Sequence, residues 1–214
     1  MINLENICFD IGAYGGNWAL ANVNNFDKII AVEASFFVYE QILKKINNYK
    51  ILPLHYAVCN NDCKYITFHK CTTDTSLSTL NKEWLTNPKS RYYDKLYHNI
   101  ELISKTIKID KLIEIYGKPN FIKINVEGAE YECISSLNTK IDLLCFKWIS
   151  EFNEITLNCL DYLENLGYTK FYIQDGYDYT FKPPENEFNY SILNAKLLLS
   201  TKIDRFDGGM IWCK

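Results

Sequence analysis

The sequence predicts an α/β fold: a mostly parallel sheet of seven strands with an antiparallel last strand, and helices on both faces. Short apolar runs alternate with segments of helical periodicity, which is the pattern of βαβ units. A glycine-rich turn follows the first apolar run directly, and an acidic residue ends the second run about twenty residues later. Folds that bind a nucleotide-like cofactor at the carboxyl ends of parallel strands share this layout, so we expect a Rossmann-like topology.

The strands are expected where apolar residues run together or alternate with polar ones. The run at 143–150 is apolar almost throughout, as in a strand that is buried on both faces. The alternation loosens between residues 64 and 109, where 64–70 resembles an exposed strand. The long connection at 175–205 suits an antiparallel pairing of the last two strands. The expected strands cover residues 7–10, 28–33, 51–58, 64–70, 100–109, 121–126, 143–150, 170–174 and 209–213.

Helices are expected between the strands. Residues 35–47 carry apolar side chains at near-helical spacing behind Ser35, which is suited to act as the N-cap. Gly117 and Pro119 mark the end of another helix, and Gly167 marks the end of a later one. The expected helices cover residues 16–24, 35–47, 80–85, 110–116, a segment that opens near 129, and 156–165.

The length of 214 residues, 48% of them apolar, suits a single domain with a packed core. We expect this domain to span residues 1–214, with a substrate-lid insertion at about 72–105, where the sequence is polar and aromatic. No apolar run approaches the roughly 20 residues that cross a bilayer, and the N-terminus lacks the pattern of a secretory signal. We therefore expect a cytoplasmic protein without a membrane span.

Charge and cysteine content disfavour two other classes of protein. The net charge of −3 opposes a dedicated nucleic-acid binder, which would carry a basic face. The eight cysteines include no Cys-x-x-Cys pair, and the three histidines sit at no metal-ligand spacing. We expect structural thiols in a reducing compartment, no dedicated metal ligands, and no nucleic-acid partner.

The first candidate site is the turn after the first strand, at residues 10–17. Its small residues let a ligand lie against the backbone, and Glu33 falls where an acid can accept hydrogen bonds from two ribose hydroxyls. A nicotinamide fold would instead carry Gly-x-Gly-x-x-Gly, with a helix N-terminus facing a pyrophosphate. Asp10 at the strand end suits a cationic ligand such as S-adenosylmethionine (SAM). A tight turn without a ligand is the alternative.

The second candidate site is the end of the run at 121–126. Burial of the preceding isoleucines leaves Asn125, Glu127 and Glu130 near the carboxyl edge of the sheet, where ligands bind in open α/β folds. Glu151 follows the next buried strand in the same way. A structural interpretation of Glu127 and Glu130 stays open, because acids in the first turn of a helix interact favourably with its dipole.

With these residues in place, the chain resembles the FkbM family of SAM-dependent methyltransferases. The matching segments are 9–13, 32–34, 57–58 and 123–130, the last of which reads Lys-Ile-Asn-Val-Glu-Gly-Ala-Glu, and the resemblance covers roughly 7–155. It implies a class I methyltransferase fold, SAM as cofactor, and methyl transfer to a small carbohydrate, usually at a sugar hydroxyl of a glycan or nucleotide sugar. The cofactor-binding residues that it implies are Asp10, Gly12, Ala13, Tyr14, Gly16, Asn17, Glu33, Ala34, Ser35, Ala57, Val58 and Ser76.

One position departs from the family pattern, because Asn125 stands where the family usually has aspartate. An amide cannot act as a general base and is a weaker metal ligand than a carboxylate, so the dependence on a divalent metal stays open. Either the proton leaves through Glu127, Glu130 or Glu151, or the acceptor is an amine. A third interpretation is a catalytically silent SAM-binding partner of a glycosyltransferase. The catalytic candidates are Asn125, Glu127 and Glu151.

The surroundings of the acceptor are less strongly patterned. Aromatic faces and hydrogen-bond donors suit carbohydrates, and the sequence offers them in the insertion and near the C-terminus. The chain begins almost at the first strand, without a helical cap, so a second subunit in a homodimer is one way to cover the pocket. The candidate sugar-binding residues are Arg91, Tyr92, Tyr93, Tyr97, His98, Tyr172, Tyr177 and Tyr179.

Overall fold

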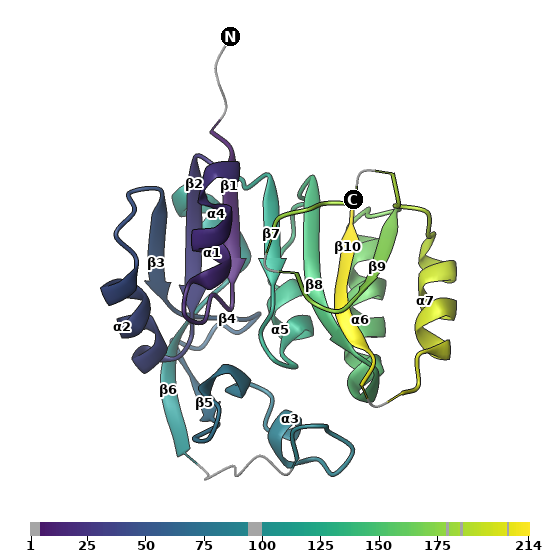
Figure 1. Ribbon diagram of the computed structural model, residues 1–214, viewed down its shortest axis with the longest axis horizontal. Coiled ribbons are helices and arrows are strands. Elements are labelled where there is room, and N and C mark those ends of the chain that lie inside the picture. Colours follow the sequence, from purple (N-terminus) through teal and green to yellow (C-terminus); the bar gives the residue numbers. More distant parts are fainter. Residues whose placement is uncertain (1–4, 94–99, 179, 185, 205) are drawn as a thin grey trace.

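The computed structural model describes residues 5–93, 100–178, 180–184, 186–204 and 206–214, with the backbone alone for 100–103. Within these residues, seven strands form the main sheet in the order β3-β2-β1-β7-β8-β10-β9 (Figure 1). Strand β10 pairs antiparallel with β8 and β9, and the other neighbours pair parallel, so the predicted sheet is confirmed. The strands are β1 (Ile7–Ile11), β2 (Lys28–Glu33), β3 (Ile51–His55), β7 (Phe121–Ile124), β8 (Leu143–Ile149), β9 (Phe171–Asp175) and β10 (Gly208–Cys213).

Helices cover both faces of the sheet, as predicted. In Figure 1, α1 and α2 lie in front of the first strands, where Trp18 and Ile42 join the core that lines the front of the sheet. On the rear face, α4, α5 and α6 bury Leu112, Ile134 and Leu160 against the strands. The helices are α1 (Asn17–Asn22), α2 (Phe36–Lys45), α3 (Glu83–Thr86), α4 (Ile109–Tyr116), α5 (Glu130–Ile134), α6 (Asn153–Asn165) and α7 (Ile192–Thr201), with 3-10 turns η1 (Val23–Asn25), η2 (Thr75–Leu77) and η3 (Ser150–Phe152).

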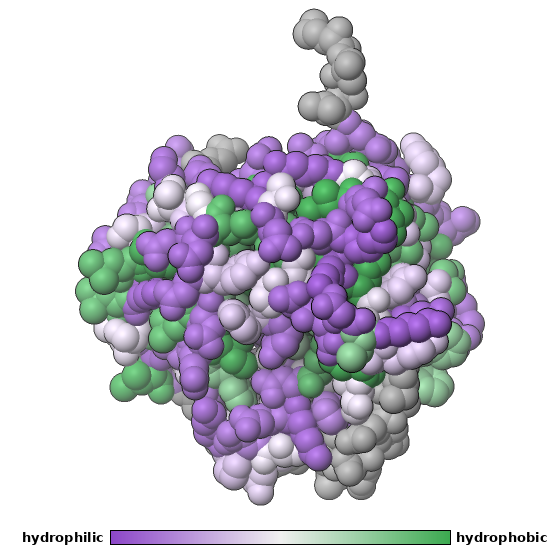
Figure 2. Space-filling view, turned by 180° about the vertical axis from the view of Figure 1, so that it is seen from behind, coloured by the Kyte–Doolittle hydropathy of each residue, from purple (hydrophilic) through white to green (hydrophobic). Residues whose placement is uncertain are grey.

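The rear face of the molecule is hydrophilic over much of its area, with apolar residues in separate patches (Figure 2). Helix α6 illustrates how the sequence produces this division. Its buried face carries Leu160 and Leu163, whereas Asp161 and Glu164 are exposed. Across the described part of the chain, no helix is long and apolar enough to cross a membrane.

Helix α7 is absent from the sequence prediction, which treats 175–205 as a connection. Its buried residues are Ala195 and Leu199, whereas Leu193 and Leu197 are exposed. Apolar residues therefore occupy both the buried and the exposed side of the helix. The sequence lacks the alternation of apolar and polar residues that would indicate an amphipathic helix. The signal that was available is Ser191, whose side chain caps the helix by accepting a hydrogen bond from the backbone N–H of Asn194.

The predicted single strand at 51–58 is wrong, because the chain changes sheet at Tyr56. Strand β3 ends at His55, which is paired with Glu33, the last residue of β2. Beyond that residue β2 offers no further partner, so the chain leaves the main sheet. Ala57 and Val58 form β4, which pairs with β6 in a second sheet of order β4-β6-β5. Strands β5 (Tyr65–Lys70) and β6 (Ile100–Ile107) complete this sheet below the carboxyl ends of the main strands (Figure 1).

Residues 176–191, here called the front segment, connect β9 to α7. Phe181 in this segment packs against the rings of Phe26, Phe121 and Trp212, with centroids 5.0, 4.8 and 6.3 Å away. The backbone N–H of Phe181 also donates a hydrogen bond to the side chain of Asn22 at the end of α1. The front segment is therefore held against the front of the sheet, on the side that carries α1.

Candidate active site

A cavity of about 820 Å³ lies at the carboxyl ends of β1, β2 and β7 and continues beneath the front segment. This volume is in the upper part of the range for small-molecule sites, so it can hold more than one small ligand. Eleven of the predicted site residues line the cavity: Gly12, Ala13, Tyr14, Asn17, Glu33, Ala34, Ala57, Val58, Ser76, Asn125 and Glu127. The other four, Asp10, Gly16, Ser35 and Glu151, lie outside its lining.

The turn after β1 brings the end of this strand against the end of β7. Gly12 has a φ of +75°, and a Cβ added there would lie 1.8 Å from the backbone oxygen of Asn125. Its N–H donates to the carbonyl of Val32, which ties the turn to β2 as well. Gly16 also has a positive φ, but a Cβ there would meet Ile46. Gly12 therefore shapes the cavity wall, whereas Gly16 allows the packing of α2.

Glu33 is a buried carboxylate at the end of β2. Its two oxygens accept hydrogen bonds from the backbone N–H groups of Tyr14 (2.9 Å) and Ser35 (2.7 Å). Burial raises the pKa of Glu33 to about 7, although these two hydrogen bonds act in the opposite direction. A carboxylate has about four lone-pair sites, so Glu33 retains the capacity to accept hydrogen bonds from a ligand.

Asp10 is fully buried and paired with Lys123, which lies opposite it on β7. The Nζ of Lys123 lies 2.7 Å from one oxygen of Asp10 and 3.4 Å from the carbonyl oxygen of Gly12. Burial raises the pKa of Asp10, and the charge of Lys123 opposes that rise. Lys123 lines the cavity and Asp10 does not, so a ligand would meet the lysine before Asp10.

Glu127 and Lys147 form a second buried ion pair, and both residues line the cavity. The Nζ of Lys147 lies 2.6 Å from each carboxylate oxygen of Glu127. The rings of Trp84, Tyr92 and Tyr177 surround this ammonium, with centroids 5.0, 5.8 and 5.4 Å away. Sequence reasoning missed Lys147, although a lysine inside the apolar run of β8 was an available signal.

Asn125 and Glu130 follow β7 but face different surroundings. The side-chain oxygen of Asn125 is buried in the cavity wall and has no hydrogen-bond partner among the described residues. Glu130 instead accepts hydrogen bonds from the N–H groups of Val126 (3.1 Å) and Gly128 (3.0 Å), and burial raises its pKa to about 7. The structural interpretation therefore suits Glu130, which holds the turn between β7 and α5.

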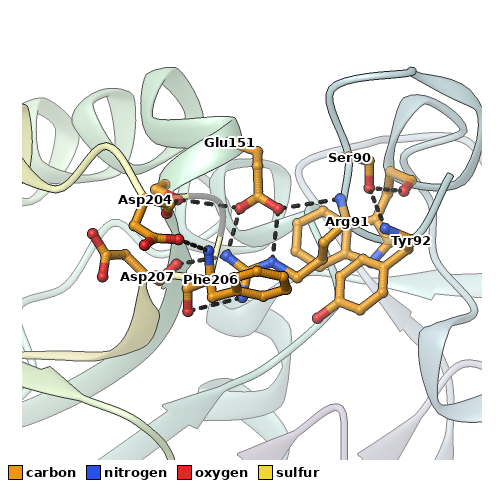
Figure 3. A network of polar contacts seen from close by, with 9 residues as sticks. Ser90, Arg91, Tyr92, Glu151, Asp204, Phe206 and Asp207 are labelled. Atoms are coloured by element: carbon orange, nitrogen blue, oxygen red, sulfur yellow. Dashed lines mark hydrogen bonds and ion pairs between the residues drawn. The ribbon is translucent and has the colours of Figure 1, made fainter.

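Glu151 is engaged by Arg91, as Figure 3 shows. One carboxylate oxygen accepts hydrogen bonds from the backbone N–H (3.1 Å) and Nε (2.7 Å) of Arg91, and the other accepts from a terminal guanidinium nitrogen (2.5 Å). The guanidinium also donates to the carbonyls of Phe206 and Asp207. This contact fastens the segment that carries Arg91 to the loop before β10 and fixes the backbone next to Tyr92.

Some of the predicted sugar-binding residues line the cavity and others do not. Tyr92, Tyr172 and Tyr177 line the cavity, whereas Arg91 and Tyr93 do not. Tyr97, His98 and Tyr179 lie outside the described residues. Within the described chain, no group of three or more His, Cys, Asp or Glu side chains is placed to hold a metal ion.

The cavity has the features that SAM requires. Gly12 lines the cavity, and its lack of a Cβ lets the turn after β1 lie directly against the backbone of Asn125. The carboxylate of Glu33 is placed to accept from ribose hydroxyls, and the unpartnered oxygen of Asn125 offers a further acceptor in the wall. The residues present therefore fit the cofactor that the sequence predicts.

Comparison with known proteins identifies the family of this chain. The model of the methyltransferase FkbM domain matches residues 10–170, whereas a search of curated proteins found no match. Similar solved structures include a precorrin-6y C5,15-methyltransferase from Geobacter metallireducens (12% identity, TM-score 0.46, covering 100% of this chain and 82% of that chain). Another is phosphoethanolamine N-methyltransferase 2 of Haemonchus contortus in complex with SAM (8% identity, TM-score 0.45, covering 100% and 49%). Because the FkbM domain matches most of the sequence, this chain belongs to the FkbM family of SAM-dependent methyltransferases.

Proposed function

We propose that this enzyme methylates a hydroxyl of a sugar in the biosynthesis of a glycan or nucleotide sugar. The observation that carries the proposal is one wall of the cavity, which is lined by Asn125, whose buried side-chain oxygen has no hydrogen-bond partner among the described residues, and by Glu127 with its buried carboxylate. Asn125 can accept a hydrogen bond from a hydroxyl and orient it, and Glu127 can take its proton.

The cofactor half of the cavity is formed by the turn at Gly12–Asn17, Glu33 with Ala34, and the β4 residues. Ser76 on η2 faces them, and the hydroxyl of Tyr14 lies 3.4 Å from that of the neighbouring Thr75. SAM supplies an electrophilic methyl group when it is bound. In-line positioning alone is worth roughly 7–11 kcal/mol, and a general base adds about 10²–10⁴-fold. An enzyme with Asn125 in place of aspartate can therefore remain active.

Glu127 is the best-placed proton acceptor of the three glutamates that follow the strands. All three have partners: Glu127 is paired with Lys147, whereas Glu130 accepts from two backbone N–H groups and Glu151 is bound by Arg91. Neither Glu130 nor Glu151 lines the cavity, whereas Glu127 does. We therefore assign the proton to Glu127, and to Asn125 the orientation of the acceptor.

The remaining half of the cavity lies under the front segment and is rich in aromatic side chains. Tyr92, Tyr172, Tyr177 and Trp212 line it together with the amide of Gln174. Aromatic faces beside hydrogen-bonding groups suit a hydroxylated sugar ring. An amino sugar is the second candidate acceptor, because the oxygen of Asn125 could equally accept a hydrogen bond from an amine.

The first expected result concerns the ligand and the acceptor. Calorimetric titration should give a dissociation constant on the order of micromolar for SAM and no binding of NAD. Transfer of labelled methyl should then be faster to a hydroxyl sugar than to the matching amino sugar. Absence of SAM binding would overturn the cofactor assignment, and SAM binding without transfer to any sugar would support the catalytically silent interpretation.

The second expected result is that the affinity for a ribose-containing ligand depends on pH through the ionisation of Glu33. With a pKa of about 7, Glu33 is mostly protonated at pH 6 and mostly ionised at pH 8. Ribose hydroxyls donate to the ionised form, so the affinity should rise by about tenfold between these two pH values. Adenosine is the appropriate probe, since it carries no group of its own that titrates in this range.

The control for this titration is Glu33→Gln. The amide does not titrate, so the pH profile of adenosine binding should become flat. Its affinity should also fall by one to two orders of magnitude, through the loss of charged hydrogen bonds worth roughly 1.5–3 kcal/mol. A flat profile in the unsubstituted protein would remove Glu33 from the ribose site.

A further inference from the structure

Lys147 occupies an unusual position for a lysine. It lies in the middle of β8, where its neighbours Phe146 and Trp148 are fully or almost fully buried, and only 6% of Lys147 itself is exposed. Burying an ammonium and a carboxylate together costs free energy, and a well-packed hydrophobic pair in their place is often neutral or stabilising. Packing of β8 therefore does not explain the Glu127–Lys147 pair.

Lys147 lines the cavity and has a hydrogen-bond donor to spare. An ammonium has three N–H donors, and its contacts with the two oxygens of Glu127 account for two of them. Among the described residues, no oxygen partner of the third donor is found. Trp84 stands behind the ammonium, outside the cavity lining, whereas Tyr92 and Tyr177 stand at the cavity itself.

The protonation states of this cluster are set by its surroundings. Burial lowers the pKa of Lys147, but Glu127, Tyr177 and Tyr92 together outweigh that effect and the net pKa is raised. Burial raises the pKa of Tyr92 and of Tyr177. At neutral pH these three groups are therefore hydrogen-bond donors that do not accept a proton from a substrate, and Glu127 is the base beside them.

We propose that Lys147 is a catalytic residue of the methyl transfer, whose third N–H binds the acceptor oxygen and stabilises the negative charge that develops there. This inference rests on the proposed function. The O–H bond of the acceptor breaks, its proton passes to a carboxylate oxygen of Glu127, and the electron pair left on the oxygen forms the bond to the methyl carbon. The pair of electrons of the broken carbon–sulfur bond stays on sulfur.

The same geometry determines which acceptor is preferred. An ammonium donor is complementary to the lone pairs of a hydroxyl oxygen, and it strengthens that oxygen as a nucleophile by favouring loss of its proton. A protonated amino sugar has no lone pair on its nitrogen, so it cannot accept a hydrogen bond from Lys147. Lys147 therefore makes the site selective for hydroxyl acceptors over the matching amines.

The test compares Glu127→Gln with the double variant Lys147→Met and Glu127→Gln. The first removes the base and keeps the ammonium without its counter-charge, and the second leaves a neutral pair of similar size that avoids an unpaired buried charge. The ratio of kcat/KM for a hydroxyl sugar to kcat/KM for its amino counterpart should be about tenfold or more lower in the double variant. Calorimetry in the presence of S-adenosylhomocysteine should show about tenfold weaker binding of the hydroxyl sugar.

Three further measurements distinguish a role of Lys147 in catalysis from a folding defect and from a failure of the proposed function. Thermal unfolding establishes that each variant is folded, and Lys147→Arg, which retains the charge, should keep the preference for hydroxyls. An unchanged ratio in a folded double variant would overturn the role of Lys147, because a structural defect slows both acceptors equally. Failure of the unsubstituted enzyme to methylate any sugar would instead count against the proposed function.

Discussion

Replacing Gly12 with alanine is expected to destabilise the protein by about 3–5 kcal/mol, the sum of a strained backbone and a steric clash. Gly12 has a φ of +75°, which side chains of L-residues rarely adopt. The added Cβ would also lie 1.8 Å from the backbone oxygen of Asn125, so β1 and β7 could not keep their present separation at the cavity wall. For a chain of this size the melting temperature should fall by about 6–20 °C.

Gly176 provides a matched control that measures the cost of backbone strain without the steric clash. Its φ is +77°, but no atom lies within 4 Å of the position that a Cβ would occupy. Gly176→Ala should therefore cost only about 1 kcal/mol of conformational strain, which corresponds to roughly 2–4 °C. Equal losses in the two variants, measured by scanning calorimetry, would show that the contact with Asn125 does not constrain the turn.

The turn at Gly12 also shows why much of this fold can be predicted from sequence. Alternating apolar runs, a glycine turn and an acid at a strand end are local signals, and each corresponds to one element of the main sheet. The break at Tyr56 is different, because it depends on where β2 ends and on the presence of β6 far along the chain. No local signal records such pairing, so the split between β3 and β4 could not be predicted.

The candidate site shows the same limit at the level of side chains. Three glutamates follow buried strands in similar ways, yet only Glu127 reaches the cavity lining. Glu151 is bound by Arg91, which is 60 residues away in the sequence, and Glu130 is bound by its own turn. The sequence predicts which residues reach the carboxyl edge of the sheet. Their partners depend on tertiary contacts that the pattern of residues does not encode.

Replacing Lys123 with methionine is expected to destabilise the protein by about 3–5 kcal/mol, because it leaves the carboxylate of Asp10 buried without a counter-charge. Asp10 is fully buried, and Lys123 is its ion-pair partner at 2.7 Å. Burial already raises the pKa of Asp10 against the opposing charge of Lys123, so removal of the lysine should raise it further. A carboxyl group with a raised pKa in the folded state favours folding at low pH. The deficit should therefore be smaller at pH 5 than at pH 8, as measured by urea unfolding.

Adding Asp10→Asn to this variant removes the buried charge, and most of the lost stability should return. The double variant also separates two roles of Asp10. If Asp10 acts by holding Lys123 and the turn at Gly12, the double variant, once its stability is restored, should bind SAM with an affinity within about threefold of the unsubstituted protein. We expect this result, because Lys123 lines the cavity and Asp10 does not. A loss of tenfold or more in a fully stable double variant would mean that the carboxylate itself attracts the cationic cofactor, as the sequence alone suggests.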